Sequence, residues 1–324
     1  MSINVRELAE SVRDYMIGMR REFHMYPEIG LEEWETLKRI KRELNAMGLV
    51  EGQDYVNFEG TTGVLVTMKG GKPGKTLLMR CDIDALAGAE ESGVEFTSRN
   101  EGFIHSCGHD GHMAMMLGAI KALLTVKEEI AGTIKCLFQP SEENGKGGVM
   151  MIDRNVMDGV DGAFGIHLWS KIPTGSICVN EGPRMGGCEF FTVEVEGKSA
   201  HGATPHDGID ATVAASALVM NLQQIVSRKV DPLKSAVVTV GHMVCGDLRN
   251  TIAEKALIEG TTRTFSMELM DWENDGCFKN QIERIVAGTA ATYGVKAEVT
   301  QYWRGAYPVI NTKEASEMGN AVVE

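Results

Sequence analysis

The sequence predicts an α/β protein with a mostly parallel sheet, interrupted by an inserted α+β domain of ferredoxin-like strand and helix order. The chain has 324 residues, which is too long for one ordinary hydrophobic core. Short, continuous apolar runs alternate with helical patterns in its first half. From about residue 187, apolar and polar residues instead alternate with period two. We therefore expect a first domain at residues 1–184 and 304–324, and an inserted domain at 185–303.

The first domain is expected to begin with helices and then to alternate strands with helices. The charged N-terminal segment has a helical period, and a second helix over residues 31–47 ends at Gly48. Uninterrupted apolar runs separated by helical segments are typical of strands in a parallel sheet. The strands expected are 63–69, 76–81, 133–138 and 162–168, and the later helices are 108–126 and 147–155.

The inserted domain is expected to follow the order strand, helix, strand, strand, helix, strand. That order is typical of a single sheet with two helices covering one face. The elements expected are 188–197, 211–227, 235–244, 255–265, 272–293 and 297–303. Residues 304–324 are then expected to return to the first domain.

Composition and charge exclude several classes of protein. The net charge of −13 argues against nucleic-acid and anionic-membrane partners, since both favour a basic surface. No stretch approaches the roughly 18 apolar residues of a membrane span, and the charged N-terminus lacks the apolar segment of a secretory signal. Seven scattered cysteines do not suggest a disulfide framework, so we expect a cytoplasmic protein in which the Cys107 thiol is free.

Polar residues follow three of the expected strands, at the point where each strand ends. These residues are Asp82 and Asp84, Glu142 and Glu143, and His167. Ligand sites in open α/β sheets assemble at the carboxyl edge of the strands, so we expect these side chains to lie close together. The segment HSCGHDGH at 105–112 leads into a helix and is expected to face the same edge.

The segment HSCGHDGH contains a pair of residues that are suited to metal binding. Cys107 and His109 are two positions apart, so both side chains can face one side of an extended or turning segment. A thiolate and an imidazole suit zinc, manganese-like and nickel-like ions to differing degrees. The alternative for Cys107 is an inert buried thiol. We expect His112 to cap or pack the helix, and His105 to lie outside the ligand set.

The acidic pair and the remaining polar residues have both a catalytic and a structural interpretation. Glu142 and Glu143 are adjacent, so one can bind a metal while the other faces a substrate water as general base. The alternative is a pair of solvated acids at a helix start, where negative charge is favourable. His167 is a metal ligand or a satisfied core histidine. Asp84 is placed to orient a ligand or base, and Asp82 is alternatively a turn residue.

Four motifs together resemble the M20 metallopeptidase family, in its amidohydrolase branch (subfamily D). That branch includes hydrolases of N-acyl amino acids, hippurate and indole-acetyl amino acids. The inserted segment VEGKSAHGATPHDGIDATVAASALVMNLQQIVSR is similar to the lid domain of the branch, and the resemblance covers nearly the whole chain in order. The four motifs are RCDIDAL, HSCGHDGHMAMMLGAIKAL, LFQPSEENGKGG and GIHLW.

The resemblance implies a catalytic domain with a binuclear centre for two divalent metal ions (Zn, Mn, Co or Ni). The ligand positions match Cys107, His109, Glu143 and His167. The general base that activates a water against an amide carbonyl matches Glu142, and the acid that orients the centre matches Asp84.

The resemblance also assigns roles to residues of the inserted domain, which it identifies as a lid and dimerisation domain. His201 matches a histidine that helps to polarise the substrate carbonyl, often across a dimer, and Asn250 matches an asparagine that contacts substrate. Arg263 is a weaker candidate for binding a free carboxylate through its guanidinium fork. The alternative for Arg263 is a surface salt bridge.

The sequence departs from the family pattern at three places. Alanine stands where the family has proline at Ala87 and Ala253, which should loosen two turns but leave the polar residues in place. Family members also continue beyond Val323 with a last strand, a helix and a final histidine ligand. The chain stops within a helical pattern without a capping signal, so we expect it to be a fragment lacking the C-terminal part of the catalytic domain.

The resemblance implies metal-dependent hydrolysis of the amide bond of an N-acyl amino acid or dipeptide, by a homodimer formed through the lid. Two other classes stay open. One is a non-catalytic protein that binds acylated amino acids, and the other is a dimerising structural protein. The presence together of all four ligand positions and of Glu142 favours the enzyme.

Overall fold

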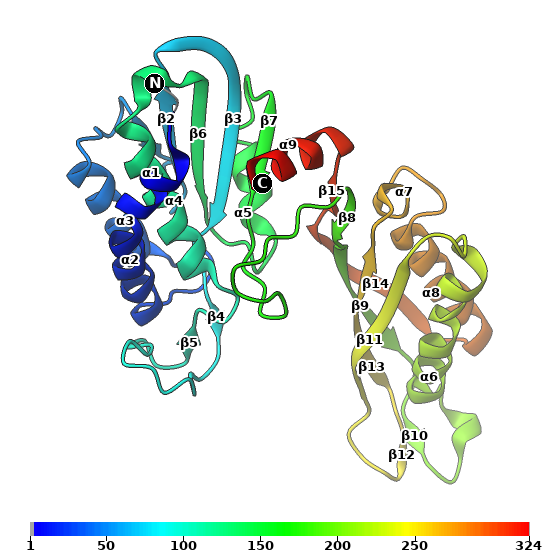
Figure 1. Ribbon diagram of the computed structural model, residues 1–324. Helices are drawn as coiled ribbons and strands as arrows, with labels where there is room; N and C mark the ends of the chain where they lie inside the picture. The colour runs from blue at the N-terminus through cyan, green and yellow to red at the C-terminus, as the bar shows by residue number, and fades with distance from the viewer. Residues whose placement is uncertain (1–2, 324) are drawn as a thin grey trace. The chain divides into compact units, whose positions relative to one another are not determined.

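The computed structural model describes residues 3–323, which divide into two compact units (Figure 1). The first unit ends at Thr174 and the second begins at Gly175. Each unit has its own sheet and its own hydrophobic core. The domain boundaries expected at residues 184 and 304 stay a prediction.

The first unit combines a central sheet with helices on both faces. Its helices are α1 (Val5–Ser11), α2 (Arg13–Met25), α3 (Trp34–Ala46), α4 (His109–Leu124), a short 3-10 turn at Lys127–Glu129, and α5 (Lys146–Ile152). Its strands are β1 (Tyr55–Asn57), β2 (Val64–Lys69), β3 (Lys72–Asp82), β4 (Leu86–Ala87), β5 (Phe103–Ile104), β6 (Ala131–Gln139) and β7 (Gly162–Gly165). The order in the main sheet is β1-β2-β6-β3-β7, and β4 and β5 form a separate pair.

The main sheet is mixed, so the expectation of a mostly parallel sheet is confirmed only in part. β3 runs parallel to both β6 and β7, whereas β2 runs antiparallel to β1 and to β6. The reason is the connection between β2 and β3, which consists only of Gly70 and Gly71. A parallel connection needs a dozen or more residues, so this short turn must reverse the chain. β6 lies between β2 and β3 and runs with β3, so it must run against β2.

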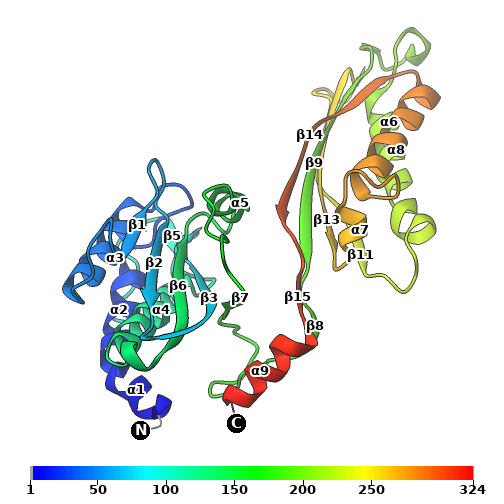
Figure 2. The same cartoon turned by 90° about the horizontal axis from the view of Figure 1, so that it is seen from above.

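Side chains of β6 point alternately to the two faces of the sheet, and both faces are covered. Cys136 and Phe138 pack into the larger core with residues of α2, α3 and α4, while Leu137 packs with Met151 of α5 on the other face. Figure 2 shows α2, α3 and α4 together on one side of the sheet. Double coverage explains why this strand reads as a continuous apolar run in the sequence.

The second unit contains the α+β order that the sequence predicts. Its helices are α6 (Ala211–Leu222), α7 (Met267–Met270), α8 (Phe278–Tyr293) and α9 (Lys313–Val323), with short turns at Pro205–Asp207 and Ile225–Lys229. Its strands are β8 (Gly182–Met185), β9 (Gly187–Glu196), β10 (Ala200–His201), β11 (Ala236–Cys245), β12 (Thr251–Ile252), β13 (Lys255–Thr264), β14 (Lys296–Ala306) and β15 (Val309–Asn311). The main sheet is antiparallel with the order β11-β13-β9-β14, and α6 and α8 bury their apolar side chains against it.

The two ends of the second unit lie together. β8 pairs antiparallel with β15, and the side-chain amide of Asn320 in α9 donates to the main-chain oxygen of Val179 over 3.1 Å. The return of residues 304–324 to the first domain, expected from the sequence, therefore stays a prediction.

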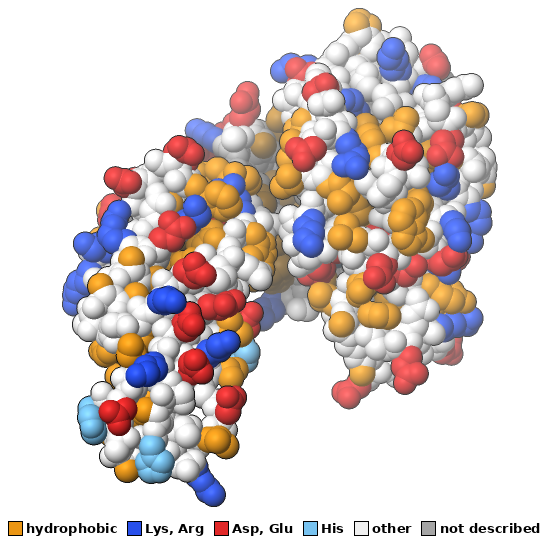
Figure 3. Space-filling view, turned by 180° about the vertical axis from the view of Figure 1, so that it is seen from behind, with side chains coloured by type: hydrophobic (Ala, Val, Ile, Leu, Met, Phe, Trp, Pro, Cys, Tyr) orange, Lys and Arg blue, Asp and Glu red, His pale blue; other side chains and the backbone are white. Residues whose placement is uncertain are grey.

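The surface charge and the helices can be compared with the expectation that the protein binds neither nucleic acid nor membranes. Figure 3 shows acidic side chains interspersed with basic ones over the visible face, rather than a basic patch. Among residues 3–323, no helix combines the length and the apolar character needed to cross a bilayer. All seven cysteines are free.

Candidate metal centre

The polar residues expected at one sheet edge converge in the first unit. β3, β6 and β7 are parallel neighbours, and Asp84, Glu143 and His167 all follow the carboxyl ends of these strands. Helix α4 enters the same place from Gly108, whose φ of +93° is in the left-handed region that favours glycine. The backbone can therefore turn sharply between Cys107 and the first residue of α4.

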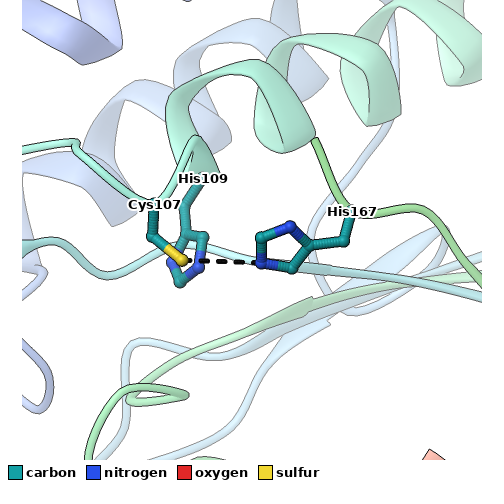
Figure 4. Close-up of side chains that lie close together, drawn as sticks. All are labelled: Cys107, His109 and His167. Carbon is teal, nitrogen blue, oxygen red and sulfur yellow. Dashed lines mark hydrogen bonds between the residues drawn. The ribbon is translucent and has the colours of Figure 1, made fainter. Parts of the chain in front are cut away.

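Cys107, His109 and His167 point toward one another (Figure 4). The Sγ atom of Cys107 lies 3.5 Å from Nε2 of His167. One atom from each of the three side chains lies within 4.8 Å of the others, and the same holds for His109, Glu142 and Glu143. His109 therefore belongs to both of these groups of metal-competent side chains, and it also belongs to a third, with Asp82 and His112.

The main chain fixes which nitrogen of each histidine faces the cluster. Nδ1 of His109 donates to the main-chain oxygen of Asp84 over 2.8 Å, and Nδ1 of His167 donates to that of Leu168 over 2.6 Å. A carbonyl oxygen only accepts, so each Nδ1 carries a proton and each Nε2 can present a lone pair to a cation. This second hydrogen bond is typical of histidines that bind metals.

The Nε2 atom of His109 gives an independent test of metal binding. The His109 side chain is fully buried, yet its Nε2 has no hydrogen-bond partner within residues 3–323. A buried polar atom without a partner costs about 1–3 kcal/mol. A cation held with Cys107 and Glu143 would satisfy this atom, and thiolate, imidazole and carboxylate suit zinc and similar ions. The residues present therefore fit a metal centre.

The electrostatics of the cluster favour positive charge at its centre. Burial alone would lower the pKa of His109, but Asp84, Cys107 and Asp82 outweigh burial and raise it to about 11. Burial alone would raise the pKa of Asp82, but the hydrogen bond from His112 and the positive charge of Arg80 hold it well below its usual range. Carboxylates that stay ionised here would attract a divalent cation as they attract a proton.

Glu142 differs from its neighbour in its surroundings. Burial raises the pKa of the Glu142 carboxyl; Arg80 opposes the increase, and the Glu143 carboxylate adds to it. A raised pKa suits a general base that must accept and release a proton near neutrality. The main-chain N–H of Glu143 donates to Oδ2 of Asp84 over 2.9 Å, which fixes the backbone of the acidic pair.

Asp84 connects two parts of the cluster, and its role as an orienting residue stays a prediction. Its main-chain oxygen accepts from His109 and its carboxylate accepts from the backbone of Glu143. The side chain is fully buried, so these contacts are not exposed to competing water.

The structure resolves the alternatives for His112 and Asp82. Nδ1 of His112 donates to Oδ1 of Asp82 over 2.6 Å, and Nε2 accepts the N–H of Leu168 over 2.8 Å. Both ring nitrogens thus have partners, and His112 packs as expected. Asp82 is not a simple turn residue, because Arg80 also donates to its carboxylate over 2.6 Å. Sequence reasoning passed over Arg80, although residues two apart on a strand share one face.

His105 lies outside the ligand cluster but is buried. Neither of its ring nitrogens has a hydrogen-bond partner in the described part of the chain, and burial lowers its pKa to about 4. Burial therefore favours the neutral form of His105, and its expected place outside the ligand set stays a prediction.

The substrate-binding candidates lie in the second unit, and two of them are neighbours there. β10 pairs with β12, with His201 opposite Thr251, and the N–H of Gly202 donates to the main-chain oxygen of Asn250 over 2.8 Å. The structure therefore brings His201 and Asn250 together.

Arg263 lies elsewhere in the second unit. It is near the far end of β13, whose other end continues into the β10 and β12 region. Its guanidinium donates to the hydroxyl of Thr261 over 2.5 Å and stacks 5.5 Å from the ring centre of Phe190. The structure does not group Arg263 with His201 and Asn250.

The fold and the cluster define a class of protein: a metal-dependent hydrolase, with a buried histidine and a partly buried thiol and histidine beside a carboxylate whose pKa is raised. Comparison with known proteins makes this class specific. The family model described as peptidase family M20/M25/M40 matches residues 78–324. The chain belongs to this family and is an M20-type metallo-amidohydrolase.

Several relatives have similar sequences or structures. N-acetyl-L-cysteine deacetylase of Bacillus subtilis is 38% identical over 304 residues, which cover 93% of this chain and 70% of the relative. N-acyl-L-amino acid amidohydrolase of Geobacillus stearothermophilus is 37% identical over 321 residues, covering 98% of this chain and 84% of the relative. The crystal structure of the Bacillus subtilis YXEP protein, a dinuclear metal-binding peptidase of the M20 family, matches with a TM-score of 0.79 and 30% identity, over 97% of this chain and 80% of that one.

Proposed function

We propose that this protein hydrolyses the amide bond of N-acyl amino acids, and of related dipeptides, at a centre for two divalent metal ions. The observation that carries the proposal is the buried Nε2 of His109, which has no hydrogen-bond partner in the described part of the chain and faces Cys107 and the Glu142–Glu143 pair. The names of the similar deacetylase and amidohydrolase support the acylated amino acid as substrate.

Four side chains would hold the metal ions, and they offer a mixed donor set. The ions that this set suits include zinc, manganese, cobalt and nickel, and the supply in the cell decides among them. When bound, the ions would polarise the substrate carbonyl and lower the pKa of the attacking water. The proposed ligands are Cys107, His109, Glu143 and His167.

Glu142 would carry the proton through the reaction. Its carboxylate removes one proton from the attacking water, and the oxygen of that water forms a bond to the carbonyl carbon. The C–N bond then breaks, and Glu142 returns the proton to the leaving amine nitrogen, so that acid and free amine result. Asp84 would keep His109 and the backbone of Glu143 in place during this cycle.

The second unit would complete the substrate site as a lid. We assign His201 to the oxygen of the substrate carbonyl, where one well-placed donor contributes about 10²–10³ in rate. Asn250, its neighbour, would contact the substrate, and Arg263 is the weaker candidate for the free carboxylate. The lid would span residues 185–303, between two parts of a catalytic domain. Two copies of the protein would form a homodimer through their lids. The protein would be cytoplasmic.

Metal content and turnover measured on the same preparation test the proposal. Purified chain loaded with manganese or zinc should contain about two ions and should release free amino acid from N-acetyl amino acids. A chelator should remove both properties, and added metal should restore them. Tight binding of acyl amino acids without turnover would instead support the non-catalytic binding protein, and the proposed activity would be wrong.

A further inference from the structure

The loop that carries Glu142 and Glu143 has a conformation that needs support. Ser141 is fully buried and has a φ of +54°, in the left-handed region that non-glycine residues seldom adopt. Its hydroxyl donates to Asn144 over 2.7 Å within the same loop. A strained backbone of this kind persists only where neighbouring groups hold it.

One of these groups is Glu33, a fully buried carboxylate distant in sequence. Its Oε1 accepts the main-chain N–H of Ser141 over 2.8 Å, and its Oε2 accepts the hydroxyl of Thr62 over 2.7 Å. Glu33 stands at the start of α3, but its side chain makes no capping hydrogen bond to that helix. Burying a carboxylate is costly unless hydrogen bonds stabilise it, so these contacts account for its position.

A second buried carboxylate holds the other side of the general base. Asp84 accepts the N–H of Glu143, while Glu33 accepts the N–H of Ser141. The main-chain amides on either side of Glu142 are therefore each fixed by one buried carboxylate, Glu33 on one side and Asp84 on the other.

We propose that Glu33 is a positioning residue, which through Ser141 directs the Glu142 carboxylate to the reacting water and the Glu143 carboxylate to the metal ions. The inference rests on the proposed function for the chemical roles of Glu142 and Glu143. The hydrogen bond to the Ser141 amide is the contact that matters, so an uncharged acceptor of the same shape should serve as well.

Three variants of similar side-chain volume test this role. Glu33→Met removes the acceptor, and Glu33→Gln keeps it. Glu28→Met is the matched control, because the Glu28 carboxylate lies in the same segment but accepts main-chain N–H groups of Glu35 and Thr36 in α3. Each variant is measured for hydrogen exchange in residues 139–146, for manganese affinity, and for kcat and KM with an N-acetyl amino acid.

We expect Glu33→Met to speed hydrogen exchange in residues 139–146. It should also weaken manganese binding and lower kcat, each by about 10–100-fold, as is found for other residues that support a metal ligand without binding the metal. KM should change by no more than about threefold, because the contact acts on the general base rather than on substrate binding. Glu33→Gln should restore all three properties, and Glu28→Met should alter only thermal stability.

Several results would overturn the role of Glu33. Unchanged exchange, manganese affinity and kcat in Glu33→Met would do so, as would equal losses in Glu28→Met. If Glu33→Met does not fold, a loss of kcat in a folded Glu33→Gln would refute the acceptor role, and wild-type kcat and manganese affinity would uphold it. If the wild-type chain cleaves no acyl amino acid while exchange and manganese affinity still respond to Glu33→Met, the proposed function fails and the positioning role stands.

Discussion

At the candidate metal centre, hydrogen bonds to single, identifiable atoms fix the orientation of individual side chains. His109 and His167 place Nδ1 on main-chain oxygens and leave Nε2 for the centre. Glu142 and Glu143 are adjacent in sequence, and buried carboxylates hold the main-chain amides of Ser141 and Glu143, on either side of Glu142. Small changes of chemistry at these positions should therefore separate metal binding from proton transfer.

Glu142→Gln makes this separation directly. The amide cannot accept the proton from water, so kcat should fall by about 10²–10⁴-fold. Because Glu142 is not among the proposed ligands, the variant should bind as much metal as the wild type. Metal analysis and an amide hydrolysis assay on one preparation check both statements. Wild-type kcat, or loss of the metal, would show that Glu142 is not the base.

At the scale of secondary structure elements, α5 packs directly against the acidic loop. The N–H of Gly147 donates to the main-chain oxygen of Ser141 over 3.0 Å. A Cβ atom added at Gly147 would lie 1.5 Å from the main-chain oxygen of Pro140, whereas one added at Gly148 would meet nothing nearer than 3.8 Å. Two adjacent glycines of one helix therefore make a matched pair.

Gly147→Ala should displace the acidic loop, since its Cβ clashes with main chain that cannot turn aside. We expect it to destabilise the protein by about 1–3 kcal/mol and to weaken metal binding. Gly148→Ala should instead be neutral, or stabilise α5 by up to about 1 kcal/mol. Urea unfolding and metal titration of both variants check the prediction. Similar behaviour of the two alanines would contradict it.

α2 and α3 are joined at the surface by an ion pair that should respond to pH. The Arg42 guanidinium donates to both oxygens of Glu22, over 2.9 and 2.8 Å, and holds the pKa of Glu22 below its ordinary value of 4.5. The carboxylate is thus more stable folded than unfolded. Its stabilisation is complete above the unfolded pKa, and is lost as the pH falls through the folded pKa.

Glu22→Gln tests whether the stabilisation by this ion pair is lost, rather than gained, as the pH falls. At pH 7 the variant should be less stable than the wild type by about 0.5–1 kcal/mol, because the pair is partly exposed. The difference should shrink as the pH falls below 4.5 and vanish in stronger acid. Urea midpoints for both proteins between pH 7 and pH 3 give the measurement, and a difference that grows in acid would reverse the assignment.

The sequence predicts the elements better than their pairing. The β6 run and its acidic ending are local patterns, and the structure has them close to the expected positions. The antiparallel β2 was not predicted, since an apolar run does not reveal its direction within a sheet. The contact of Glu33 was also not predicted, because Ser141 lies 108 positions away and no local pattern connects them.

At the scale of the whole molecule, the proposed metal centre lies within one unit. All four proposed ligands precede Thr174, where the first unit ends. A ligand that binds only folded protein stabilises the part that holds it, by about 2.7 kcal/mol at one hundred times Kd. The two units should therefore respond differently to metal.

Calorimetry with manganese and with a chelator checks this difference. Metal should raise the melting temperature of one transition, assigned to the first unit, and leave a transition of the second unit unchanged. Hydrogen exchange during the same titration assigns each transition to its residues. A uniform shift of both transitions, or no shift, would mean that binding is not confined to the first unit.

The place of β6 between β2 and β3 has a consequence for how the protein reaches its native state. β2 and β3 are close in the chain but cannot form a simple hairpin, because β6 occupies the position between them. β6 must instead pair with both β2 and β3 from a distant part of the sequence. Contacts between segments far apart in sequence form late and slow the folding of a domain. β6 also leads to Glu142 and Glu143, so the ability to capture metal should appear only in the final phase of refolding, after most helical structure has formed.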